Sequence, residues 1–468
     1  RNFVADLNYR TGNDDRIARL TADNTFYRNG LDSTGYVRQR QQYGNDTENY
    51  GASLSYTEPL GKQQYLELRA SRQQYTNNTE KNFYDLFEVP TPGETFNPLL
   101  SNRFRRGYRY DRAGLNYLRN RKYYNLTAGA ALQNSVLDGT LAGSEENLSR
   151  KFTRVLPALF YNYEPRIGRN FAVEYTTDLR EPSLEQLQPV VDNSDPLNTY
   201  SGNPNLEPEY THNLELRMMR FDQFTMTSFF ATLGATYVDD RITNASTVDS
   251  LFRRHILPVN VAQDLTLNGY VNFGRPIRPI KSNLHINLGS TYNRGILFVN
   301  EVENNTDRWQ HSIDFNLDNR KKEKIDVSAG VRLLLNSTKY SVSEALNQQY
   351  LNQRYYADVT VFPGKKWAIS SGLDYSVYSA EAFGEQTSIP LWRASVTRYF
   401  LKNKRGQLKL AAYDLLNRNV AITRNSQFNY IEEERIVSLG RYVMLGFAYS
   451  ISGFGNDKGG MEMRVIRN

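Results

Sequence analysis

Hydrophobic and polar side chains alternate along most of the chain with a period of two residues. The clearest stretch spans residues 325–336, where Ile325, Val331 and Leu333 are among the apolar odd positions and most even positions are polar. Because successive side chains of a strand point to opposite faces, this pattern predicts strands with one apolar face and one wet face. The same split recurs at 309–318, 355–361, 367–377 and 443–451.

The alternating segments are long for a soluble protein. Each runs about 10–15 residues, against about 5–6 in ordinary soluble sheets and about 9–11 in a tilted strand that crosses a bilayer. Tight and long connections alternate along the chain between these segments. This alternation is typical of a transmembrane barrel with short periplasmic turns and long extracellular loops. Tight turns are expected at 58–62, 164–168, 319–322 and 362–365. Long connections are expected near 76–106, 138–150, 180–209, 238–262, 295–306, 337–350 and 418–437.

The predicted fold class is therefore all-β, a transmembrane antiparallel β-barrel of about 19 strands, with on the order of 25 residues for each strand and its connection. A sheet in lipid must close, because each unpaired backbone group costs several kcal/mol in hydrocarbon. Bacterial single-chain barrels have even strand numbers, so we expect residues 1–453 to form a barrel whose N-terminal strands are missing. Residues 454–468 are expected to be a polar periplasmic tail.

Composition agrees with a sheet that is wet on one side. Hydrophobic residues make up 39% of the chain, below the roughly 45–50% of an average globular domain, whereas tyrosine alone contributes 33 residues. No apolar run approaches the roughly 18 residues of a membrane-spanning helix. Since the net charge of +7 is spread over 57 basic and 50 acidic side chains, no nucleic-acid partner is expected. The absence of cysteine excludes disulfides, thiol nucleophiles and zinc–thiolate sites.

The sequence offers little chemistry for catalysis or metal binding. Residues 192–195 cluster oxygen ligands suited to calcium, but they lack the glycine and distal glutamate of a regular calcium loop, so a solvated turn is expected. No nucleophile elbow, Walker loop or dinucleotide fingerprint is present, and we expect no enzyme activity, cofactor or metal. The four histidines show no metal-binding spacing. Alternation places His212 and His311 on lipid-facing rows, His285 in the lumen and His255 in a loop.

Five segments resemble one protein family. The stretches 175–189, 193–198 and 202–210 resemble the middle of the barrel of TonB-dependent outer-membrane receptors, and 408–417 with 440–449 resemble its last two strands. More narrowly, the chain is similar to the outer-membrane β-barrel branch related to glycan-importing receptors that carry a lipoprotein lid. The resemblance implies a 22-stranded barrel around an N-terminal plug, opened by a TonB-type energy-transducing protein. These residues contain no plug, and their strands would be the fourth to the last.

The resemblance also fixes an expected strand direction. The last strand of the family descends to the periplasm, and counting back in pairs makes the first strand here, near Phe3 to Tyr9, descend as well. A periplasmic turn is then expected at residues 11–15.

The stretch Gly-Asn-Pro-Asn-Leu-Glu-Pro-Glu at 202–209 has a local physical meaning of its own. Pro204 and Pro208 favour extended conformations at the residues before them, including Asn203, and Gly202 permits a tight turn. The segment is therefore predicted to be a stiff loop that re-enters a strand. We expect this role to be structural, with direct ligand contact the less favoured alternative.

Alternation also places charged side chains of both signs in the lumen, which suggests a hydrated interior. A ligand path is predicted along Arg332, Asp326, Asp358, Asp374, Tyr356 and Arg217. The leading hypothesis is a barrel of the bacterial outer membrane, in contact with its lipids, that imports a ligand captured by loops near 76–106, 180–209 and 238–262. One alternative is a structural or scaffold subunit of an assembly or secretion complex with surface lipoproteins. Another is a passive porin.

Overall fold

The computed structural model describes residues 1–450 except for thirteen short gaps. The predicted tail at 454–468 lies outside the described residues, as does most of the oxygen-rich cluster at 192–195. The gaps are 27–32, 88–91, 143–146, 190, 193–196, 250–252, 320–321, 343, 345–346, 380–385, 402–403, 428–429 and 438.

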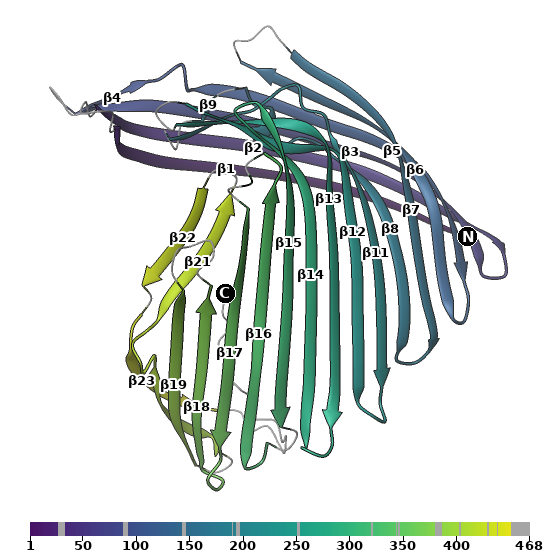
Figure 1. The fold of residues 1–468 in the computed structure, drawn as a ribbon. Coiled ribbons are helices and arrows are strands. Elements are labelled where there is room, and N and C mark those ends of the chain that lie inside the picture. Colours follow the sequence, from purple (N-terminus) through teal and green to yellow (C-terminus); the bar gives the residue numbers. More distant parts are fainter. Residues whose placement is uncertain are drawn as a thin grey trace.

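One sheet of 21 strands forms the body of the molecule (Figure 1). Its long strands are antiparallel and follow one another in chain order, because each tight turn joins two sheet neighbours. They are β1 (Asn2–Phe26), β2 (Ser33–Gly61), β3 (Gln64–Phe87), β5 (Asn102–Asn120), β6 (Tyr124–Leu141), β7 (Asn147–Arg166), β8 (Arg169–Arg180), β11 (Glu209–Asp222), β12 (Thr227–Val248), β13 (Arg254–Ile277), β14 (Ser282–Val299), β15 (Val302–Asn319), β16 (Ile325–Tyr340), β17 (Gln348–Val361), β18 (Trp367–Tyr378), β19 (Thr387–Phe400), β20 (Gly406–Tyr413) and β23 (Tyr442–Tyr449).

The remaining elements are short. Three of the 21 strands are short: β4 (Gly93–Phe96), β9 (Val191–Asp192) and β10 (Asn198–Ser201). β4 pairs with β3, β10 pairs with β13 and β9 pairs with β10, so eighteen long strands carry the fold. A separate hairpin of β21 (Val420–Gln427) and β22 (Tyr430–Val437) joins β20 to β23. The helix α1 covers Leu184–Leu187. No helix among the described residues is long and apolar enough to cross a membrane.

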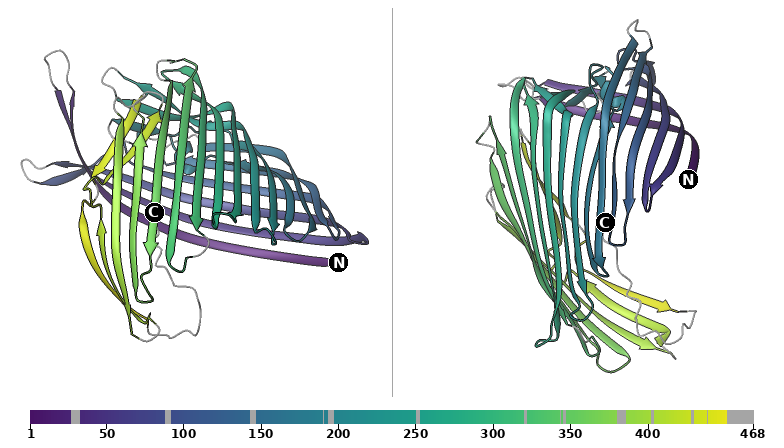
Figure 2. Two further views of the ribbon diagram at one scale, coloured as in Figure 1. Left: turned by 60° about the horizontal axis from the view of Figure 1, so that its bottom comes forward. Right: turned by 90° about the vertical axis from the view of Figure 1, so that its right-hand side faces the viewer.

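The sheet is strongly curved, but it does not close within the described residues. Figure 2 shows that the purple edge of β1 does not meet the yellow edge of β23. Within the part of the chain that the structure describes, β1 pairs with β2 alone and β23 with β20 alone. The all-β antiparallel architecture is as predicted, and two strand edges remain open.

The predicted turn at residues 11–15 is wrong. β1 runs through this stretch without a break, and Thr11 and Asp15 pair with Glu48 and Gly44 of β2. Counting strand directions back in pairs from the last strand led to the turn prediction. The polar stretch did not contradict it, because strands that continue beyond the bilayer are wet on both sides and lose the alternation. The first tight turn instead follows Gly61, so β1 rises toward the extracellular end.

Most of the predicted long connections are extended hairpins. The stretch 295–306, for example, is strand except for Asn300 and Glu301, whose φ angles of 49° and 68° form a two-residue turn of the type that matches strand twist. The strands flanking 76–106, 138–150 and 238–262 likewise continue far into those regions. Among the described residues of these regions, 180–209 is the stretch that is mainly irregular.

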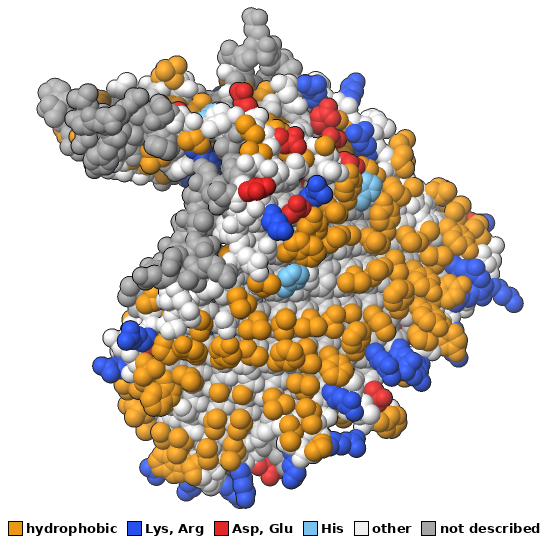
Figure 3. Space-filling model, in the orientation of Figure 1, with side chains coloured by type: hydrophobic (Ala, Val, Ile, Leu, Met, Phe, Trp, Pro, Cys, Tyr) orange, Lys and Arg blue, Asp and Glu red, His pale blue; other side chains and the backbone are white. Residues whose placement is uncertain are grey.

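The outward face carries the apolar rows. Figure 3 shows a broad hydrophobic band across it, with Lys and Arg side chains along its lower margin and charges of both signs above. Phe315 and Leu373 are 41% and 44% exposed on this face, which would be unfavourable in water but suits contact with lipid tails. Trp309 stacks on His311 in the upper part of the band, as interfacial aromatic residues do.

Candidate functional site

The register places all six residues of the predicted ligand path on the inner face. On β16, for instance, Val331 is paired with Phe315 and Tyr355 of the apolar rows, so its neighbour Arg332 points to the opposite side. Arg332, Tyr356, Asp358 and Asp374 lie close together on β16, β17 and β18. Asp326 sits near the periplasmic turn, and Arg217 lies on β11, several strands away.

Charges on the inner face neutralise one another across the strands. Arg332 donates from Nε to Asp314 Oδ2 at 2.8 Å, and Arg354 donates from Nε to both carboxylate oxygens of Asp374 at 2.9 Å. These four side chains run across β15 to β18 as a row that we call the lumenal ion-pair row: Asp314, Arg332, Arg354 and Asp374. Asp314 and Asp374 are only 8% and 6% exposed, so the row is part of the wall rather than a set of free charges.

The other path residues are paired too. Asp358 accepts a hydrogen bond from Arg393 at 2.5 Å, and the Tyr356 hydroxyl accepts one from Asn316 at 3.2 Å. Asp326 lies 3.1 Å from Lys322. Arg217 binds Glu174 and Glu215, each at 3.0 Å. The wall is therefore polar but locally neutral.

Gly372 allows one of these pairs to form. Arg393 of β19 reaches Asp358 of β17 across the intervening strand β18, directly over Gly372. A Cβ atom at this position would lie 2.3 Å from Asp358 Oδ1 and 2.7 Å from Arg393 Nε. The missing side chain at Gly372 thus leaves the space in which the two charged groups meet.

Removing one member of the lumenal ion-pair row is expected to leave a poorly hydrated partner. Arg354→Ala should lower the free energy of unfolding by about 1–3 kcal/mol, because the carboxylate of Asp374 loses its charged donor while remaining buried. In the double variant Arg354→Ala/Asp374→Ala the cost should be smaller than the sum of the single costs by about 1 kcal/mol or more. Urea unfolding in lipid vesicles measures this, and strictly additive costs would contradict the pairing.

The segment between β8 and β11 folds into the mouth of the sheet. It begins with a reciprocal cap on α1, in which the Gln186 amide donates to Ser183 Oγ at 3.2 Å and the Ser183 amide donates to Gln186 Oε1 at 2.8 Å. Leu187 and Leu206 are fully buried, at 0% and 1% exposure, against inner-face side chains. The hydrophobic cluster they join contains Phe104, Tyr108, Leu137 and Ile242. We call residues 181–208 the inward segment.

A buried arginine fixes the start of the inward segment. Arg106 of β5 donates from Nη2 to the Pro182 carbonyl at 3.0 Å and lies 3.4 Å from the Glu181 carboxylate. Burial lowers the pKa of the Arg106 guanidinium, and Glu181 opposes that shift. The inward segment is thus anchored by charge at its beginning and by leucine side chains further along.

The predicted re-entry motif lies at the end of the inward segment. The Gly202 amide donates to the Gln188 carbonyl at 2.9 Å, and a Cβ atom on Gly202 would lie 2.5 Å from the Glu185 and Gln188 carbonyl oxygens. Asn203 donates from Nδ2 to the Pro258 carbonyl at 3.1 Å. Pro204 and Pro208 bracket the chain as it turns toward β11. The motif is packed on the protein itself, and its structural role remains a prediction.

The three regions predicted to capture ligand meet one another. Lys81 of β3 lies 3.1 Å from Asp192 in the inward segment. His255 of β13 hydrogen-bonds Thr199 and Ser201, each at 3.1 Å, while β10 pairs with β13 in parallel. The prediction that His255 lies in a loop is therefore wrong, because the residue belongs to β13. Regions 76–106, 180–209 and 238–262 form one cluster at the extracellular end.

The other three histidines occupy the faces that alternation assigned them. His212 and His311 belong to the outward rows, where they contact Tyr175 at 2.8 Å and Ser290 at 3.0 Å, and His285 lies 3.2 Å from Asp318 on the inner face. Among the described residues, no group of three or more His, Cys, Asp or Glu side chains is placed to hold a metal ion.

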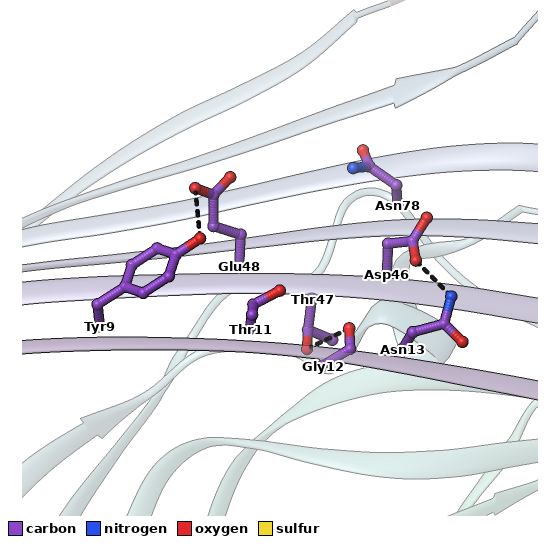
Figure 4. A pocket seen from close by; sticks show the side chains of 8 residues that line it. All are labelled: Tyr9, Thr11, Gly12, Asn13, Asp46, Thr47, Glu48 and Asn78. Carbon is purple, nitrogen blue, oxygen red and sulfur yellow. Dashed lines mark hydrogen bonds between the residues drawn. The ribbon is translucent and has the colours of Figure 1, made fainter.

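A small polar hollow lies on the extracellular part of β1, β2 and β3 (Figure 4). Six of its eight lining residues bond one another in pairs. Tyr9 donates to Glu48 at 3.5 Å and Asn13 donates to Asp46 at 2.8 Å. Thr47 donates to the Gly12 carbonyl at 3.2 Å. Because these groups satisfy each other at the surface, the hollow is a feature of the hairpin rather than a ligand site.

Sequence reasoning missed the partners of the predicted path. Asp314, Arg354 and Arg393 lie on the inner face by the same alternation that selected Arg332, so the face could have been assigned to them. Their pairing could not be predicted, since it depends on the register between strands. The anchor Arg106 gave no sequence signal, because it lies in a stretch with several other arginines.

These observations define the class of the protein. A curved sheet of long antiparallel strands, apolar outside and polar within, with short turns at one end and extended hairpins at the other, is an integral β-barrel of an outer membrane. The family model described as "Outer membrane protein beta-barrel family" matches residues 1–449, so the chain belongs to this family and resides in the bacterial outer membrane. The predicted family, fold class and location are confirmed. No curated protein matches the sequence.

The solved structures that the chain matches are distant in sequence. FpvA of P. aeruginosa bound to heterologous pyoverdines is 11% identical, with a TM-score of 0.48 and coverage of 96% of this chain and 54% of FpvA. BauA, the ferric preacinetobactin receptor from Acinetobacter baumannii, is 11% identical, with a TM-score of 0.46 and coverage of 96% and 60%. The ferric citrate transporter FecA is 10% identical, with a TM-score of 0.43 and coverage of 94% and 59%. The chain therefore spans less than two thirds of each of these proteins.

Proposed function

We propose that the protein imports a solute across the outer membrane after capturing it at the extracellular mouth of the barrel. The observation that carries this proposal is the inward segment, which occupies the mouth and is held there by Leu187, Leu206 and Arg106. A pore that admits all small solutes has no need for a mouth built from three contacting regions. A selective importer does, because its ligand must meet a defined surface.

The captured solute would then pass along the inner wall. Arg332, Tyr356, Asp358 and Asp374 present polar atoms there, while their ion pairs leave little net charge to trap a passing molecule. Asp326 and Arg217 extend this polar lining toward the periplasmic turns and toward β11. These six residues remain our candidates for the ligand path.

The proposal includes closure of the sheet. Open edges on β1 and β23 would leave unpaired backbone groups in hydrocarbon, so further strands are expected to pair with both edges. The resemblance of 175–189, 202–210 and 408–417 to TonB-dependent receptors supports a plug inside the closed barrel and a TonB-type protein that moves it.

The test uses the full-length protein in its own cells. A deletion strain should leave one or a few solutes in the medium that the parent strain removes, and mass spectrometry of spent medium detects this difference. Restoring the wild-type gene should restore removal. A variant in which residues 184–205 are replaced by a short glycine–serine linker should not, although surface immunoblots show equal amounts of barrel.

Other outcomes would point elsewhere. Identical spent media, together with co-purification of surface lipoproteins in a large complex, would replace import by scaffolding. Ion conductance of the full-length protein in planar bilayers without an energy source would indicate a passive porin.

A further inference from the structure

The outward face of β2 to β6 contains a trough just below the extracellular membrane boundary. A row of paired residues crosses these strands at one level, from Leu54 through Ala70 and Ala113 to Leu132. The two alanines form a floor between two leucines that are 50% and 52% exposed. Three strand spacings separate the leucines, roughly 14 Å. We call this hollow, of about 520 Å³, the alanine trough.

Charged side chains close the extracellular end of the alanine trough. Arg72 of β3 donates to Asp111 of β5 through two hydrogen bonds, of 2.5 and 2.8 Å. Both residues line the trough. This pair is neutral as a unit, so it caps the apolar floor without adding net charge.

The next row toward the cell exterior carries two exposed cations. Arg109 of β5 and Lys151 of β7 are both exposed there, with Val136 between them. Neither has an ion-pair partner within 4 Å among the described residues. The two nearest carboxylates on this face are engaged elsewhere: Asp111 is bound by Arg72, and Asp138 accepts a hydrogen bond from Ser149 at 2.8 Å. Tyr50 belongs to the same row and donates to Gln74 at 2.6 Å, which marks this level as the membrane–water interface.

We propose that the alanine trough binds an acyl chain of a phosphorylated glycolipid of the outer leaflet, whose phosphate contacts Arg109 and Lys151. The trough faces hydrocarbon, so its occupant must be apolar along its length. Arg109 and Lys151 stand two strand spacings apart, roughly 10 Å, within reach of one phosphate by their flexible side chains. Charge complementarity therefore selects an anionic headgroup at the point where the apolar floor ends.

The experiment is native mass spectrometry of the full-length protein released from detergent micelles, with diphosphorylated lipid A as the probe. Wild-type protein should retain lipid A in preference to its dephosphorylated form. Ala113→Phe, which fills the floor, and Arg109→Gln/Lys151→Gln, which removes the cations, should each reduce retention about tenfold, equal to about 1.4 kcal/mol. If Ala113→Phe does not fold, the lipid retention of Arg109→Gln/Lys151→Gln decides the test alone, because this variant leaves the alanine floor intact.

Matched controls lie elsewhere on the outward face. Ala235→Phe fills a lipid-facing alanine on β12, and Arg220→Gln removes an exposed cation at the periplasmic end of β11. Both should leave retention unchanged. Equal retention by the trough variants and the wild type would overturn the proposal, as would equal losses in the controls or equal retention of dephosphorylated lipid.

Discussion

Val331→Arg and Leu333→Arg are each expected to lower the free energy of unfolding by about 2–4 kcal/mol, because both place a guanidinium near the middle of the bilayer. Val331 is flanked in the sheet by Phe315 and Tyr355, which are 41% and 43% exposed on the outward face. The polar groups in these rows are the Tyr355 hydroxyl and the Gln353 amide oxygen that accepts its hydrogen bond at 2.7 Å. No carboxylate is paired in these rows among the described residues, so the charge would have to reach an interface. Urea unfolding of the full-length protein in lipid vesicles measures the cost.

Ser328→Arg is the matched control on the same strand. Ser328 points to the inner face, where it accepts a hydrogen bond from Asn316 at 3.0 Å and is paired with Asp358 of β17. An arginine here would meet water and a carboxylate, so we expect a much smaller loss. Equal losses at Val331 and Ser328 would show that the assignment of the two faces is wrong.

Leu206→Ala is expected to destabilise the inward segment by about 2–5 kcal/mol, the range for removing a fully buried leucine. Leu206 is 1% exposed and packs into the cluster with Leu187 and Phe104. The remaining barrel should stay intact, since its strands do not depend on this contact. Hydrogen exchange should therefore accelerate in 181–208 and remain slow in β14 to β18.

The control for this prediction is Leu99→Ala. Leu99 also lies in an extracellular connection, but it is 88% exposed and does not belong to the hydrophobic cluster of described residues that holds Leu206. Its replacement should leave exchange unchanged throughout. A similar acceleration in both variants would mean that the inward segment is not held by its leucine contacts.

The membrane-spanning part of the fold was predictable because two solvents impose one simple pattern. Lipid on one side and water on the other force an alternation that is visible at Ile325, Val331 and Leu333 without knowledge of any partner strand. The tight turns carry strong local signals as well, such as Gly168 and Gly364, whose φ angles are 76° and 75°. The positions of the strands, the face on which each side chain lies and the class of the protein could therefore be predicted from local features.

The extracellular part was harder to predict for the opposite reason. Above the membrane both faces of a hairpin are wet, and the polar stretch at 11–15 then reads as a turn although it is paired with 44–48 throughout. The packing of Leu187 and Leu206 against Tyr108 depends on contacts between distant segments, which no local pattern encodes. The same holds for the ion pairs of Arg332 and Asp374, which require the register of neighbouring strands.

The extended hairpins form the surface of the protein that other molecules contact outside the cell. β1 and β2 have 25 and 29 residues, whereas about 9–11 residues suffice to cross the bilayer, so much of this hairpin stands outside as pleated ribbon. On such a ribbon every second side chain recurs at a fixed interval of about 6.6 Å along one face. An antibody or a phage tail fibre that binds this surface therefore recognises the spacing between side chains as well as their chemical type. Its epitope should be lost when the protein is denatured, even though the residues it contacts are close together in the sequence.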